Sequence, residues 1–466
     1  MAIFTKKGWQ FGESGRILYG PVETNNVFRG FGGPCENINN GDAVVRYDQL
    51  ADRWLIVMPV FSRLPARDYE PEPGKDGDPA IASTPGNINQ PGKAEMLYQP
   101  PLPSAEELAL ADSLRRTRRG GSTPRDGSFC MCYAVSTGPD PFGPYYRYEF
   151  VRPLFPDYPR PAIWPDGYYI PTSTGDNIIQ KHACVVERLK MLEGKPATEL
   201  CFIIDNVNFL NNADLDGYQL PPGGDANIMI ATGGAQLNNV FEDDGIYVWK
   251  IKPDWEYPEE SLLEGPVKVD VAPYHYQGDG QLKAHVPQPG TDQKLDTQGD
   301  KIMSRVVYRR IGDTESIVAV HSVRTEAGSG GVRWYEFRIG KDRNLSLYQQ
   351  GTYAPDSLYR WMASPAIDKF GNIGIGYSVG GASLYPGQRF AGRLAGDPAG
   401  ILTLGESVLV DGEASQTNTL RWEDYTQTAI DPSDDMTIWY VGDYLKKGAD
   451  SYSTRIGAFR LGGKVK

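Results

Sequence analysis

The chain has 466 residues, 59 acidic against 47 basic side chains, and a formal net charge of −12. A surface this acidic repels phosphate groups, which argues against nucleic acids and anionic membranes as partners. No apolar run reaches the length of about 18 residues that a transmembrane segment needs. Aromatic residues make up 11% of the chain and it contains 53 Gly and 36 Pro, which is typical of many short strands joined by turns.

Five segments repeat one pattern, in which an apolar strand is followed by a turn containing Asp or Gly and by a second apolar strand. They are residues 43–61, 161–173, 305–323, 364–379 and 427–445. Asp closes such turns with its own side chain, and Gly accepts a positive φ. From Gly312 to Asp368 to Asp431 the pattern recurs after about 56 and then about 63 residues, which suits the blades of a propeller with long loops.

The recurring pattern predicts an all-β protein, with a single β-propeller domain over residues 1–466. We expect six blades, with seven as the alternative. An N-terminal strand is expected to pair near residues 455–461 and to close the ring, because closure removes exposed sheet edges. A β-sandwich explains the individual strands equally well, but it does not explain the recurring long unit.

Residues 64–125 interrupt the pattern with many prolines, glycines and charges. Inside this segment Ser104 and Glu107 form a capping box, and a row of arginines precedes Gly120, so one short helix is expected there. We interpret the segment as a long loop on one rim of the propeller. A disordered surface insertion is the alternative.

The cysteines are Cys35, Cys130, Cys132, Cys184 and Cys201. No CxxC pair occurs and the chain has four histidines, which argues against a structural zinc site. Cys184 and Cys201 flank a short segment that could turn back and allow a disulfide. Cys35 could reach either Cys132 or Cys130. Five reduced, buried cysteines are the alternative.

The segment NNADLDG contains the stronger of two candidate metal sites, and Asp431, Asp434 and Asp435 form the weaker one. Asp214 and Asp216, with Asn212, place oxygen side chains at alternate positions, as Ca²⁺ requires. An Asx-turn needs only one of these residues and is the favoured interpretation. Calcium is therefore the only cofactor that the sequence suggests.

The sequence GYSVG at residues 376–380 matches the G-x-S-x-G motif of serine hydrolases. That motif works only at a strand–turn–helix junction, and no helical pattern follows here. We therefore reject Ser378 as a nucleophile.

Other candidate site residues are polar and aromatic side chains expected at one mouth of the channel. The predicted catalytic residues are Asp157, Tyr158, His321, Arg360, Tyr377 and Asp424. The predicted substrate-binding residues are Trp361, Arg389, Arg455 and Glu315. His321 follows an apolar strand, so a buried core histidine is the favoured interpretation for it. Because an unpaired buried charge is costly, the arginines are expected to face carboxylates such as Asp157 and Asp424, or to face the solvent at an open mouth of the channel.

Several long segments carry a resemblance to known proteins. They include FGGPCENINNGDAVVRYDQLADRWLI, MCYAVSTGPDPFGPYYRYEF, CVVERLKMLEGKPATELCF and YQQGTYAPDSLYRWMASPAIDKFGNIGIGYS. In these segments the chain resembles a family of secreted bacterial proteins of no settled function with propeller-like domains. The resemblance covers most of the chain except residues 64–125. It implies export and the disulfides Cys35–Cys132 and Cys184–Cys201, and it assigns no catalytic residue.

These features predict an extracellular propeller that processes polysaccharide, as a hydrolase or lyase, at one mouth of its channel. A non-catalytic glycan-binding or adhesion module is one alternative. An enzyme that acts on a small organic substrate beneath residues 64–125 is another. We expect a monomer that is secreted or bound at the cell surface, with a signal segment that precedes Met1.

Overall fold

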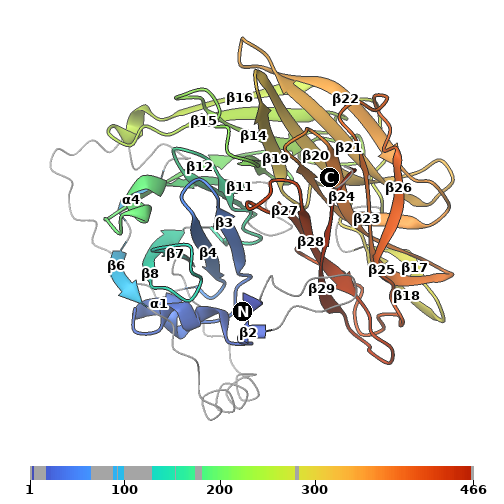
Figure 1. Cartoon of the computed structure of the whole chain (residues 1–466), viewed down its shortest axis with the longest axis horizontal. Helices are drawn as coiled ribbons and strands as arrows, with labels where there is room; N and C mark the ends of the chain where they lie inside the picture. Colours follow the sequence, from blue (N-terminus) through green and yellow to red (C-terminus); the bar gives the residue numbers. More distant parts are fainter. Residues whose placement is uncertain are drawn as a thin grey trace. The chain divides into compact units, whose positions relative to one another are not determined.

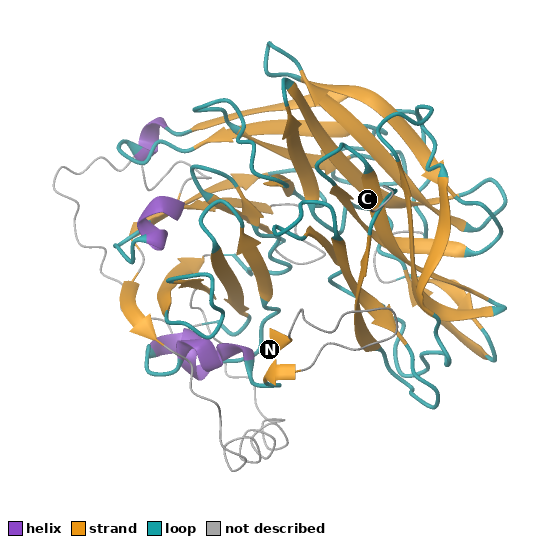
Figure 2. Cartoon of the chain, viewed as in Figure 1, coloured by secondary structure: helices purple, strands orange, loops and turns teal. Residues whose placement is uncertain are grey.

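The computed structural model describes residues 17–63, 129–152, 154–173, 181–278 and 283–462, together with the backbone of short strands at Ile3–Phe4, Ile88–Pro91 and Lys93–Tyr98. Strands dominate this part of the chain (Figure 2), and its two α-helices have five residues each. The all-β prediction is confirmed. No described helix is long and apolar enough to cross a membrane. The helix expected at Ser104 lies outside the described residues.

The chain folds as two compact units, and each is treated by itself. Unit 1 comprises Met1–Pro161, Thr172–Gly175 and Cys184–Phe202. Unit 2 comprises Ala162–Pro171, Asp176–Ala183 and Ile203–Lys466. The assignment of residues 1–466 to one domain stays a prediction.

Unit 1 is built on a five-stranded sheet with the order β3-β4-β7-β8-β6. Its strands are β3 (Val44–Asp48), β4 (Arg53–Val60), β6 (Lys93–Tyr98), β7 (Phe129–Ser136) and β8 (Tyr145–Arg152). The 3-10 helix η1 (Thr24–Phe28) and helix α1 (Gly33–Asn37) precede the sheet in the chain. Helix α4 (Arg188–Leu192) connects β11 (Lys181–Val186) to β12 (Thr198–Ile204). Strands β6 and β5 (Ile88–Pro91) lie within the segment 64–125, so our interpretation of that segment as a loop with one helix was incomplete.

Two disulfides stabilise this unit. Cys35 on α1 is bonded to Cys132 on β7 with a Cα–Cα distance of 5.7 Å, and Cys184 is bonded to Cys201 with a Cα–Cα distance of 4.0 Å. Both pairings are those that the resemblance implied, and both are confirmed. Cys130 is buried and belongs to neither bridge.

Unit 2 contains antiparallel sheets that follow one another along the chain (Figure 1). Its longer strands form four sets in chain order. The first strand of the first set, β13 (Asn211–Leu215), pairs in parallel with the first strand of the second set, β19 (Val306–Ile311), so these two sets form one eight-stranded sheet. The sets are β13 (Asn211–Leu215), β14 (Asn227–Thr232), β15 (Ile246–Lys252) and β16 (Leu262–Val269); β19 (Val306–Ile311), β20 (Thr314–Arg324), β21 (Gly330–Ile339) and β22 (Leu345–Tyr353); β23 (Tyr359–Ile367), β24 (Ile373–Gly381), β25 (Leu384–Arg393) and β26 (Leu404–Val410); and β27 (Gln427–Ile430), β28 (Ile438–Tyr444) and β29 (Ser453–Phe459). Shorter strands are β9 (Ala162–Ile163), β10 (Tyr168–Thr172), β17 (Ala284–Gln288) and β18 (Thr291–Asp296).

Successive sheets of unit 2 pack face to face through separate apolar cores. One core includes Val318 and Trp334 from the second set with Ile375 from the third. A further core joins Ala366 to Tyr440 of the last sheet. Gly376 permits this close approach, since a Cβ there would lie 2.4 Å from the Tyr440 ring. Three sheets in series with two cores differ from a two-sheet sandwich, which has one.

All five predicted strand–turn–strand segments form antiparallel hairpins. An example is β19–β20, in which Gly312 at the turn adopts a φ of 60°. Asp368 closes the β23–β24 turn by accepting the backbone N–H of Phe370. The predicted closure of a six-bladed ring is not shown: within the described residues β29 pairs with β28 alone.

Candidate functional site

A cluster of three carboxyl groups lies in unit 2, where the chain enters β27. Pairing of β27 with β28 begins at Gln427 and Val441. Two residues further along β28, the backbone N–H of Asp443 donates to Oε1 of Glu423. This side-chain oxygen accepts the hydrogen bond where β27 offers no backbone carbonyl. The Ser378 hydroxyl donates to Glu423 Oε2 at 3.0 Å. The Glu423 side chain is thereby fixed in the interior, with 4% of the residue exposed.

Trp422, which precedes Glu423 in the chain, bonds the same serine. Its indole N–H donates to the Ser378 hydroxyl at 3.0 Å, and the tryptophan is itself buried. Glu423 adopts a φ of 39°, which is uncommon for a side chain of this size. The chain therefore turns sharply between Trp422 and Asp424 and directs Glu423 inward. Strained backbone of this kind is often found at functional sites.

The second buried carboxyl group of the cluster is that of Asp443. It is 7% exposed, and its carboxylate accepts no hydrogen bond from any residue that the structure describes. Burial, followed by the negative charge of Asp424, raises the pKa of Asp443 to about 7. A carboxyl group with this pKa is a proton donor at neutral pH.

The pKa of Glu423 is raised as well. Its burial raises the pKa well above the ordinary value, and the charges of Asp443 and Asp424 act in the same direction. Two neighbouring buried carboxyls that repel each other titrate together, and one proton is retained at neutral pH.

Asp424 has different surroundings. Its side chain is 33% exposed and forms an ion pair with Arg421. The amide of Gln298 donates to Asp424 Oδ1 at 2.9 Å. The Asp424 carboxylate therefore has a cation and a hydrogen-bond donor beside it. Within the described residues, the Asp443 carboxylate has no such partner. The cluster combines a carboxyl group that can give a proton with a carboxylate that can attack or activate water.

The predicted residues Arg360 and Tyr377 both donate hydrogen bonds to Glu406. Glu406 is not one of the three carboxyl groups described above. The Arg360 guanidinium donates to Glu406 at 2.6 Å and to Asp356 at 2.8 Å. The Tyr377 hydroxyl donates to the same Glu406 oxygen at 2.9 Å. Arg360 is completely buried, and its two carboxylate partners are not the Asp157 and Asp424 that we expected.

The predicted binding residues on neighbouring strands are not gathered into one set. Trp361 is buried beside Trp422, with ring centroids 6.0 Å apart. Arg389 forms an ion pair with Asp411, and Arg455 lies on β29 with an exposed side chain. Their role in binding stays a prediction.

Glu315 and His321 lie on β20 in separate environments. Glu315 accepts the Tyr308 hydroxyl at 2.6 Å and pairs with Arg343. His321 is buried against the rings of Tyr335 and two further tyrosines, and burial followed by the charge of Arg333 lowers its pKa to about 3. The imidazole is therefore neutral at physiological pH, as expected for a core histidine.

Asp157 and Tyr158 belong to unit 1. The backbone of Asp157 pairs with Ser173 in an isolated bridge. Tyr158 has a φ of 50° and is 7% exposed, and Arg160 lies over its ring at 5.5 Å.

The candidate calcium ligands Asp214 and Asp216 are paired with an arginine. Arg305 lies 2.6 Å from Asp214 and 2.8 Å from Asp216. Asp214 also accepts the backbone N–H of Ile163, and Asp216 that of Ile367. Both carboxylates therefore join neighbouring strands and have a cation beside them. Within the described residues, the side-chain groups close enough to share a metal ion are centred on cysteines.

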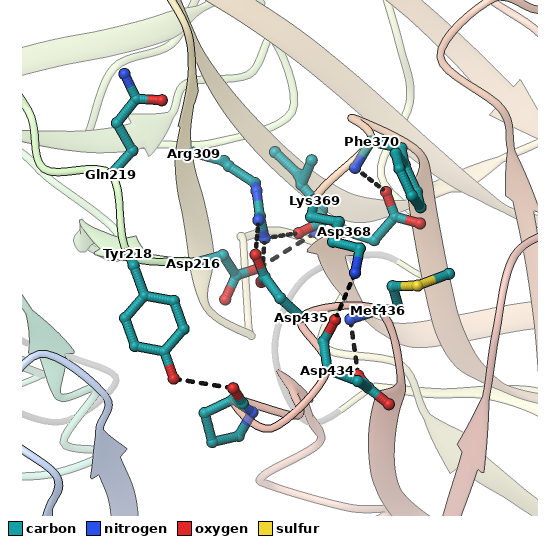
Figure 3. A network of polar contacts seen from close by, with 12 residues as sticks. Asp216, Tyr218, Gln219, Arg309, Asp368, Lys369, Phe370, Asp434, Asp435 and Met436 are labelled. Carbon is teal, nitrogen blue, oxygen red and sulfur yellow. Dashed lines mark hydrogen bonds and ion pairs between the residues drawn. The ribbon is translucent and has the colours of Figure 1, made fainter.

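Figure 3 shows the continuation of this network. Arg309 forms an ion pair with Asp435, and the backbone N–H of Lys369 donates to the Asp435 carbonyl at 2.9 Å. The Tyr218 hydroxyl donates to the Pro432 carbonyl at 2.9 Å. These contacts tie the turns of the four strand sets together, and we assign them a structural role.

Sequence reasoning missed Glu423 and Asp443. Asp424 was among the candidate residues, but its neighbour Glu423 was not. The one available signal was its position between two aromatic residues, Trp422 and Tyr425. Asp443 follows Gly442 in an apolar strand and gave no signal of its own.

No family model matches the chain, and no curated protein matches it in sequence. Among solved structures, it is similar to the K499G mutant of NanB sialidase from Streptococcus pneumoniae, at 9% identity and a TM-score of 0.34, covering 73% of this chain and 54% of that one. It is also similar to a thermostable family-43 glycoside hydrolase, at 8% identity and a TM-score of 0.31, covering 66% of this chain and 91% of that one. Similarity at this level assigns no activity.

Proposed function

We propose that this protein is an extracellular, propeller-type enzyme that cleaves glycans by general acid catalysis. The observation that carries the proposal is the Asp443 carboxyl, buried beside Asp424 with a pKa of about 7. Glycoside hydrolysis requires two carboxyl groups in different protonation states, one to donate a proton and one to stabilise or attack the sugar. The two disulfides are compatible with an oxidising, extracellular location.

In the proposed mechanism, Asp443 donates its proton to the glycosidic oxygen as the bond to the leaving sugar breaks. Asp424 is the second carboxyl group, held by Arg421 and Gln298, and it attacks the anomeric carbon or activates a water molecule. Glu423 is a positioning residue, because its carboxyl oxygen accepts the backbone N–H of Asp443. The repeated strand sets of unit 2 support a propeller-type fold, and six blades stay part of the proposal.

The test is an assay of polysaccharide cleavage by release of reducing ends, over a panel of neutral, acidic and amino-sugar polymers. We expect Asp443→Asn and Asp424→Asn each to lower kcat by about 100-fold or more, because a general acid or its partner contributes at least that much. Asp270→Asn is the matched control, since Asp270 has a 95% exposed side chain. Equal cleavage by wild type and both site variants would contradict the proposal.

The same panel distinguishes the alternatives. Glycan binding without cleavage, unchanged in Asp443→Asn, would favour a binding or adhesion module. The third alternative involves residues 64–125, most of which lie outside the described residues.

A further inference from the structure

Three cysteine sulfurs lie together in the core of unit 1. The sulfur of Cys130 is 3.7 Å from that of Cys35 and 3.8 Å from that of Cys132. Cys130 and Cys132 are two residues apart on β7, so their side chains lie on the same face of the sheet. Cys35 reaches that face from helix α1. All three residues are completely buried.

We propose that reduction of the Cys35–Cys132 bond converts this cluster into a site for a soft metal ion, Cu(I). Metal–sulfur bonds of about 2.3 Å in a trigonal arrangement place the sulfurs about 4 Å apart. The two distances to Cys130 are already close to that value. The third is the disulfide bond itself, which opens when it is reduced.

The surroundings favour a soft ion. Met58 on β4 is the direct cross-strand neighbour of Cys132, belongs to the same apolar cluster and is completely buried. Directly opposed residues have Cβ atoms about 5 Å apart, so the Met58 thioether is within reach of the site. Thiolate and thioether ligands together select Cu(I) over harder cations. The cluster also contains Phe28 and Phe31, so the sulfurs lie in an apolar setting.

The chemistry requires an external reductant. A dithiol such as dithiothreitol supplies two electrons and two protons to the Cys35–Cys132 bond and is itself oxidised to a disulfide. Each thiol that then binds Cu(I) releases its proton. The oxidised protein has one sulfur at this position in the thiol form and should not bind the ion.

The other disulfide provides an internal comparison. Cys184 and Cys201 lie within reach of Glu199, so their reduction would leave a cluster with two thiols and one carboxylate. That carboxylate is already bound by Arg152 at 2.6 Å. We therefore expect the cluster of Cys184, Cys201 and Glu199 to bind Cu(I) more weakly than the three-cysteine cluster.

The experiment uses the full chain, reduced with dithiothreitol, freed of the reagent without oxygen, and titrated with Cu(I) against a coloured chelator. The reduced wild type is expected to bind one equivalent, and the oxidised protein none. Cys130→Ser should weaken binding at least tenfold, and Met58→Leu should weaken it to a smaller extent. The double variant Cys184→Ser/Cys201→Ser is the control and should bind as the wild type does.

Three results would overturn the proposal. They are no binding by the reduced wild type with its circular dichroism spectrum retained, binding by Cys130→Ser equal to that of the wild type, and loss of binding in the Cys184→Ser/Cys201→Ser control. Peptide mapping of each reduced sample confirms that the Cys35–Cys132 bond is open. A new Cys35–Cys130 bridge in that mapping, in place of three thiols, would also count against it.

Discussion

Replacing Asp443 by Asn should stabilise the protein at alkaline pH while it removes activity. The folded chain holds the Asp443 pKa at about 7, against an ordinary value of 3.8. Below about pH 4 the group is protonated in both the folded and the unfolded chain, so it has no effect on stability. Between about pH 4 and 7 the unfolded chain releases the proton and the folded chain keeps it, so stability falls as the pH rises. Above about pH 7 the full cost is present.

The size of the effect follows from the shift. About three pKa units at about 1.4 kcal/mol each give about 4 kcal/mol, and sharing of the titration with Glu423 reduces the part that one substitution recovers. We therefore expect Asp443→Asn to raise the free energy of unfolding by about 2–4 kcal/mol at about pH 8. At about pH 5 the difference should be much smaller, since most of the cost has disappeared by then.

The assay is urea unfolding of wild type, Asp443→Asn and the control Asp270→Asn at both pH values. The control should follow the wild type, because Asp270 is exposed. An Asp443→Asn protein that is less stable than wild type at about pH 8 would refute the reasoning. A stability difference that is the same at both pH values would refute it as well.

Three further predictions concern residues outside this cluster. Arg152→Met should destabilise the protein by about 3–5 kcal/mol in thermal or urea unfolding, because it leaves the buried carboxylate of Glu199 without its cation; an unchanged midpoint would contradict this. In the oxidised protein, Cys132→Ser should lower stability by about 2–4 kcal/mol more than Cys130→Ser does, because both place a hydroxyl in the core and only the first removes a bridge; equal losses would count against the assigned bridge. The His321 imidazole, with a pKa of about 3, should show no NMR titration between about pH 5 and 8, and a midpoint in that range would be inconsistent with its buried setting.

The sequence predicted local structure better than it predicted the site. The hairpins were found because each turn needs Asp or Gly for reasons of local geometry, as at Gly312 and Asp368. The closing of sheets into a ring depends on contacts between distant segments, and the spacing of turns does not specify those contacts.

The site residues were harder to predict because burial depends on packing between strands. Arg360 was expected to form an ion pair with a carboxylate such as Asp424. It pairs instead with Glu406, a residue of its own sheet, because the strand order decides which carboxylate lies within its reach. Glu423 and Asp424 are adjacent in sequence, yet Glu423 is buried and Asp424 is partly exposed. The positive φ at Glu423 turns the chain between them, so the two side chains point in different directions. A single sequence does not reveal such a turn.

The central claim is that Asp443 keeps its proton near neutral pH in the folded protein. The most direct measurement is the titration of aspartate carboxyl carbons by ¹³C NMR in the full chain, with Asp443→Asn used to assign the signal. We predict a resonance with a midpoint near pH 7 that is missing from the variant spectrum. A midpoint for Asp443 below about pH 4.5, close to that of an exposed aspartate, would contradict the account.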